Sequence, residues 1–175
     1  MAIISASAMI RSLSLFHVTI AALLLKNPAI VSNQGVIYLL GESMQLPTPR
    51  DFNKPTAATA FIAVLFALLG LTDLTALSLS DDVFVEFWGT QTPVRCAFLF
   101  ALTGYTYMFK EGGMYAPRSY DYRMSAGASL NNSIIFTWGF LELAAWFWVF
   151  VTLRDERREK ARKLIEQRQA EADRL

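Results

Sequence analysis

The chain has 175 residues, of which 54% are hydrophobic, 13% aromatic and 18% charged, a profile that predicts a small all-α, polytopic membrane protein. A net charge of +1 gives no electrostatic reason to expect direct nucleic-acid binding, which needs clustered, unbalanced Lys and Arg. One His and one Cys leave no zinc-type ligand set, and no nucleotide-binding or hydrolase motif is present, so we assign no catalytic residue, metal or cofactor.

Residues 2–25 form the first apolar segment, which is interrupted by Arg11 and His17 and ends before Lys26. Its length predicts a membrane span. A cleaved targeting peptide is the alternative, because the segment is rich in serine and lacks acidic residues. The absence of a good cleavage site favours a retained span.

The connector that follows is too polar to cross a membrane. Within it, residues 30–46 contain the short apolar run VIYLL, at 36–40, between two glycines. A run of this length cannot span, so it predicts an interfacial or re-entrant helix. A lid that packs on the other helices is the alternative.

Residues 57–79 predict the second span, with Asp73 near its end. Residues 81–88 predict a separate short surface helix whose Trp88 lies at the membrane interface. The third predicted span, residues 93–109, begins at Pro93 and contains Arg95.

Residues 131–153 predict the fourth span, a helix of roughly 34 Å at about 1.5 Å per residue. Glu142 lies at its centre. An isolated carboxylate in lipid costs several kcal/mol, so this span must place Glu142 against other helices. Residues 1–153 are therefore predicted to form a four-helix membrane bundle.

Residues 154–175 predict a helical tail, because neither Gly nor Pro interrupts them. The pairs Glu156/Lys160 and Glu159/Lys163 have favourable spacing for ion pairs. A solvated helix and a docking site for a membrane-protein partner are both compatible with this pattern. Basic residues close to the last span predict a cytosolic tail and, with four spans, a cytosolic N-terminus. The tail's basic residues are Arg154, Arg157, Arg158, Lys160, Arg162, Lys163, Arg168 and Arg174.

Five ionisable residues fall inside the predicted spans: Arg11, His17, Asp73, Arg95 and Glu142. Counting depth along each helix suggests two groups, Asp73 with Arg95, and Glu142 with Arg11 or His17. In one interpretation these charges neutralise each other and lock the bundle. In the other they line a site for a lipid, a proton or a small ion.

Two glycines favour the first interpretation slightly. Gly70 precedes Asp73 by one turn, and Gly139 precedes Glu142 by one turn. Small residues at these positions allow two helices to approach closely.

The chain resembles the fungal "increased loss of mitochondrial DNA" protein family. The resemblance is carried by LLLKNP at 23–28, Leu46-Pro47, LLGLTDL at 68–74, TPVR at 92–95 and FLELAAWFWVFVTLRDER at 140–157. It implies a four-span protein of the endoplasmic reticulum membrane that affects the mitochondrial genome indirectly, and it brings no reaction or ligand to particular residues.

Two hypotheses for function follow. The first is a non-catalytic accessory or scaffold protein in the lipid bilayer, whose tail helix meets a membrane-protein partner. The alternative is a small-lipid or sterol binder, a small isomerase, or an ion or proton pathway that uses Asp73, Arg95 and Glu142.

Overall fold

The computed structural model describes residues 4–116 and 127–172, so the outermost residues of the first predicted span and of the tail lie outside it. The described residues form helices and turns without strands, which confirms the all-α class. The elements in chain order are α1 (Ala6–Lys26), α2 (Pro28–Ser32), α3 (Gly35–Met44), η1 (Arg50–Asn53), α4 (Ala57–Ala76), α5 (Asp81–Met108), η2 (Ala128–Leu130) and α7 (Ser133–Ala172).

Three of the described helices, α1, α4 and α7, are long and apolar enough to cross a membrane by length and composition. The third predicted span lies in α5, which is more polar. The prediction of a separate surface helix at residues 81–88 is wrong, because α5 runs without interruption from Asp81 to Met108 with Pro93 inside it. Trp88 does not lie at a surface either, since it is fully buried.

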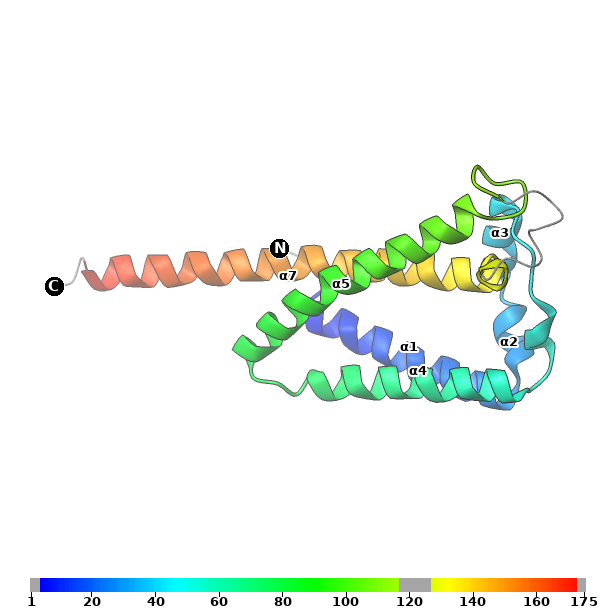
Figure 1. Cartoon of the computed structure of the whole chain (residues 1–175). Helices are drawn as coiled ribbons and strands as arrows, with labels where there is room; N and C mark the ends of the chain where they lie inside the picture. The colour runs from blue at the N-terminus through cyan, green and yellow to red at the C-terminus, as the bar shows by residue number, and fades with distance from the viewer. Residues whose placement is uncertain (1–3, 117–126, 173–175) are drawn as a thin grey trace.

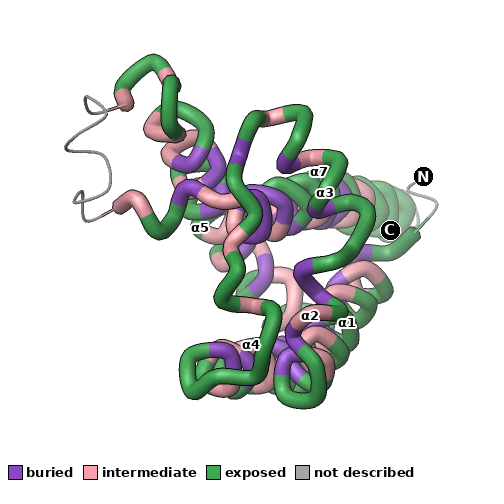
Figure 2. The backbone as a smooth tube through the Cα atoms, turned by 90° about the vertical axis from the view of Figure 1, so that its right-hand side faces the viewer, coloured by how far each residue is buried: buried purple, intermediate pink, exposed green. Residues whose placement is uncertain are grey.

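The long helices form two pairs (Figure 1). Helices α1 and α4 lie side by side in opposite directions, and α5 crosses α7 at an angle. The short elements α2, α3 and η1 gather at one end of the molecule, whereas the start of α1 and the projecting part of α7 lie toward the other. Figure 2 shows buried residues where the helices face one another and exposed residues on their outer sides.

Close approach within each pair depends on a glycine. A Cβ atom at Gly70 of α4 would lie 2.7 Å from the backbone oxygen of Ser14 in α1. A Cβ atom at Gly139 of α7 would lie 2.9 Å from the Thr103 side chain in α5. Both positions therefore have a packing reason to lack a side chain.

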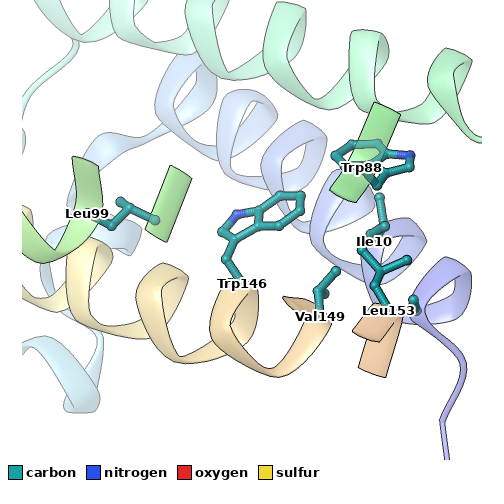
Figure 3. Close-up of a cluster of buried hydrophobic side chains, with 7 residues drawn as sticks. Ile10, Trp88, Leu99, Trp146, Val149 and Leu153 are labelled. Carbon is teal, nitrogen blue, oxygen red and sulfur yellow. The ribbon is translucent and has the colours of Figure 1, made fainter. Parts of the chain in front are cut away.

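The apolar core has two parts. One lies where α1, α5 and α7 meet and contains two fully buried tryptophans (Figure 3). The other joins α1 to the short helices and to the start of α7. The first cluster consists of Ala6, Ile10, Trp88, Leu99, Trp146, Val149 and Leu153, and the second of Leu24, Val31, Ile37, Ala63 and Ile134.

The short helix α3 includes the VIYLL run. Its Ile37 is buried in the second cluster, and Gly41 packs against Ser133 at the start of α7. Tyr38 and Leu39 are exposed on its other side. The segment thus packs on the bundle, as the lid interpretation expects, and also presents an apolar outer face, as an interfacial helix would.

Candidate functional site

Asp73 of α4 and Arg95 of α5 form a bidentate ion pair. The Arg95 Nη1 and Nη2 atoms donate to Asp73 Oδ2 and Oδ1, each at 2.7 Å. The Asp73 side chain is 4% exposed and that of Arg95 is 21% exposed. The planar guanidinium matches the two carboxylate oxygens, so neither charge of the pair is left without a partner.

Two tryptophans lie against the same guanidinium. The Arg95 Cζ atom lies 4.4 Å from the Trp146 ring centroid and 5.3 Å from that of Trp88. The two indole rings stack with centroids 5.5 Å apart. The ring faces attract the cation, and their bulk fills the space between α5 and α7.

Glu142 of α7 accepts a hydrogen bond at each carboxylate oxygen. His17 Nε2 lies 2.6 Å from Oε1, and Trp146 Nε1 donates to Oε2 at 2.8 Å. Glu142 and His17 are 4% and 0% exposed. Because an ionised carboxylate only accepts, His17 Nε2 carries the proton in this contact. The isolated acid at mid-helix therefore has a donor from α1 and another from its own helix.

Trp146 connects these contacts into one unit, which we call the polar network. Its indole N–H contacts Glu142 while its ring face contacts Arg95. The network therefore runs from Asp73 through Arg95, Trp146 and Glu142 to His17, with one or two members on each of α4, α5, α7 and α1. Such an arrangement ties four helices together through groups that are costly to separate inside an apolar core.

Three buried nitrogen atoms in or near the network have no hydrogen-bond partner in the described part of the chain. They are His17 Nδ1, Trp88 Nε1 and Trp138 Nε1. The Phe66 ring lies against the His17 and Trp138 side chains, with centroid distances of 5.6 Å and 5.8 Å. With Nε2 as donor, a neutral His17 has a lone pair on Nδ1 that accepts no hydrogen bond from the described residues.

Arg11 does not join the network. It is exposed on α1 and forms no hydrogen bond or ion pair with the described residues, so the suggested pairing with Glu142 is not made. His17 forms the contact with Glu142 instead. Trp146 was absent from the predicted set, although its four-residue spacing from Glu142 places both on one helix face and could have identified it.

The first turn of the tail is held against the bundle, a contact that we call the tail clamp. Glu156 Oε1 accepts a hydrogen bond from the Ala6 backbone N–H at 3.1 Å, which places a carboxylate at the N-terminus of α1. The Arg157 guanidinium donates to the Val85 carbonyl and fills the space beside Gly89. The tail clamp fixes the direction in which the rest of the tail leaves the bundle.

Beyond the tail clamp, most of the described tail is exposed up to Ala172. The exposed tail contains two ion pairs, Lys163 with Glu159 and Arg162 with Glu166, each with a nitrogen–oxygen distance of 3.6 Å. The other suggested pair, Glu156 with Lys160, is not made, because Glu156 bonds to Ala6 instead.

The fold and the site define an all-helical protein with three helices that could cross a membrane and with paired charges in its interior. The described residues contain no cluster of His, Cys, Asp and Glu that could hold a metal. A model of the family "Increased loss of mitochondrial DNA protein 1" (Ilm1) matches residues 4–163, and the chain belongs to this family.

Among curated proteins, the chain is similar to Protein ilm1 of Schizosaccharomyces pombe. The two are 30% identical over 145 residues, which cover 83% of this chain and 76% of that protein. No solved structure matches the chain.

Proposed function

We propose that this chain is a four-span protein of the endoplasmic reticulum membrane that acts as a non-catalytic scaffold or accessory subunit. In this proposal α5 supplies the fourth span, and both termini face the cytosol. The start of α1 and the tail lie toward the same end of the molecule, as an even number of crossings requires (Figure 1). The basic residues that follow Leu153 support the cytosolic side for that end.

The second half of α5 suits a lipid environment despite its polar sequence. Thr103 and Thr106 are buried, and their hydroxyl groups donate to carbonyls of the same helix. The outer side carries Val94, Phe98 and Phe100, which are 63%, 63% and 71% exposed. Polar groups satisfied inside and apolar groups outside are what a span requires.

The scaffold role rests on one observation: the interior charges bind one another, whereas the tail beyond Arg157 is an exposed helix. The polar network leaves no carboxylate oxygen of Asp73 or Glu142 without a donor. The tail instead presents charges of both signs and the exposed Leu164 and Ile165, which are 56% and 57% exposed. A partner protein is the kind of ligand that such a helix can bind.

The link to the mitochondrial genome comes from the family, whose name describes increased loss of mitochondrial DNA. We infer an indirect effect, through a membrane-protein partner of the tail. A net charge of +1 argues against direct binding to nucleic acid.

Deletion of residues 158–175 tests the proposal and keeps the tail clamp intact. We expect the truncated protein to stay in membranes after alkaline carbonate extraction, because the bundle is untouched. We also expect cells that depend on it to lose mitochondrial DNA as fast as cells without the protein. A tail of the same composition in scrambled order is the control for bulk and charge. Normal retention of mitochondrial DNA by the truncated protein would refute the scaffold role.

A second candidate function uses the polar network itself as a site for a small lipid or sterol, or as an ion or proton pathway. The buried, unpartnered His17 Nδ1 and Trp138 Nε1 atoms of the described structure favour it. A ligand hydroxyl group would satisfy either atom, by accepting from the Trp138 N–H or by donating to the His17 Nδ1 lone pair. This candidate predicts that the Glu142 carboxylate is indispensable even when the fold is intact.

A further inference from the structure

Arg11 is a cation on the outer side of a predicted span and has no ion-pair partner among the described residues. The inner side of α1 carries the buried residues Ile10, Ser14 and His17. Arg11 is exposed and lies about 100° around the helix from Ile10, and the apolar residue Leu15, which is 52% exposed, follows Arg11 by one turn on the same side. An arginine that faces acyl chains costs several kcal/mol at mid-membrane unless it reaches the interface or binds an anion.

The tail clamp gives the height of Arg11 relative to α7. The hydrogen bond from Ala6 N to Glu156 places these two residues at one level. Arg11 lies five residues further along α1, about 7.5 Å deeper at 1.5 Å per residue. The apolar run of α7 ends at Leu153, about 4.5 Å deeper than Glu156. Arg11 therefore starts just beneath the end of the apolar layer, within the distance that its side chain can extend.

Arg154 lies on the same side of the α1–α7 pair as Arg11. Ile10 and Leu153 belong to the same core cluster and lie close together in Figure 3. Arg11 follows Ile10 and Arg154 follows Leu153 in the sequence. Each arginine is therefore turned by about 100° around its helix axis from the residue before it. Because α1 and α7 run in opposite directions, both turns lead to the same side of the pair. Arg154 is also exposed, and neither arginine is paired with a described residue.

We propose that Arg11, together with Arg154, binds the phosphate headgroup of an anionic phospholipid in the leaflet on the tail side. This inference rests on the proposed function, because it requires α1 to span the membrane. The headgroup phosphate offers the oxygen acceptors that guanidinium groups prefer, at the level that Arg11 can reach. The acyl chains lie along Leu15, one turn further along α1 on the same side.

The test uses the full chain in nanodiscs that contain equal amounts of phosphatidylcholine and phosphatidylinositol. Native mass spectrometry then measures which lipid stays bound. We expect the wild type to retain phosphatidylinositol preferentially and Arg11→Leu to lower that retention about fivefold, the effect of one basic group at an anionic surface. Arg11→Lys should keep part of it. The matched control is Arg50→Leu, an exposed arginine at the opposite end of the molecule, which should change nothing.

Unchanged phosphatidylinositol retention in Arg11→Leu would overturn the lipid site. A second result would also overturn the lipid site. If Arg11→Leu abolished a cross-link to another membrane protein but retained the lipid, Arg11 would pair with an acidic residue of that protein. Alkaline carbonate extraction distinguishes the absence of the lipid site from the failure of the proposed membrane topology. A chain released by carbonate does not span the membrane, whereas a chain that stays and shows no lipid preference lacks only the site.

Discussion

The interior and the tail of this protein use the same kinds of charged residue in opposite ways. In the interior, Asp73 and Arg95 meet at 2.7 Å with side chains 4% and 21% exposed. In the tail, Glu159 and Lys163 lie 3.6 Å apart with side chains 38% and 65% exposed. Water can replace a partner in the tail but not in the interior, so the same substitution should have very different costs in the two regions.

Arg95→Ala should lower the stability of the protein more than any other substitution that we propose, and it tests the difference between interior and tail most strongly. It leaves the Asp73 carboxylate buried without a partner and removes the cation that lies against the two tryptophan rings. We expect a loss of about 3–5 kcal/mol in the free energy of unfolding. Unfolding in detergent, followed by tryptophan fluorescence, measures it. The control Lys163→Ala in the tail should cost less than about 0.5 kcal/mol. Equal costs for the two variants would contradict the account.

Trp146→Phe sharpens the comparison within the interior. It keeps an aromatic ring but removes the N–H that donates to Glu142. We expect a cost of about 1–3 kcal/mol, because a buried charged acceptor loses a donor. Trp138→Phe is the matched control, since the Trp138 N–H has no partner in the described structure. The same unfolding assay should rank Trp146→Phe as clearly more damaging, and the reverse order would show that the Trp146 hydrogen bond is unimportant.

Gly70→Ala tests whether the network depends on close contact between α1 and α4. The added Cβ would meet the Ser14 backbone, so one helix must move. We expect a cost of about 1–3 kcal/mol. Gly104→Ala in α5 is the control, because open space surrounds that position and Ala favours a helix by about 1 kcal/mol. A neutral Gly70→Ala variant would mean that α1 and α4 are packed less closely than described.

Gly89→Ala should have the smallest effect on stability and acts where interior and tail meet. The new methyl group displaces the flexible Arg157 guanidinium rather than backbone, so unfolding should change by less than about 1 kcal/mol. Limited proteolysis should instead cut faster near Arg157, because the tail clamp has lost one contact. An unchanged cutting rate would show that Arg157 does not hold the tail.

The sequence allowed the helices to be predicted where a segment is long and mostly apolar. The helices α1, α4 and α7 follow directly from such segments. Helix α5 was divided wrongly, because Pro93 has the local signature of a helix start. Trp88 and Thr92, both fully buried, keep the helix continuous through Pro93, and their packing offsets the roughly 3 kcal/mol that an internal proline costs. Tertiary contacts of this kind are not visible in a local pattern.

Depth along the helices suggested the contacts of Asp73 with Arg95 and of Glu142 with His17, which the structure contains. Depth alone could not decide whether His17 or Arg11 contacts Glu142. Depth gives the position of a residue along the helix, whereas the direction in which its side chain points depends on rotation about the helix axis. The buried stripe of α1 includes His17 and excludes Arg11. The functional role of these residues stays a prediction.

The most direct test of the account is Glu142→Gln, assayed for both stability and retention of mitochondrial DNA. The amide keeps the shape of the side chain, and a neutral His17 can shift its proton to Nδ1 and accept from the amide. If the polar network serves only to hold the helices together, the variant should fold, remain in membranes and retain mitochondrial DNA like the wild type. A variant that is as stable as the wild type yet inactive would contradict the account and establish the network as the functional site.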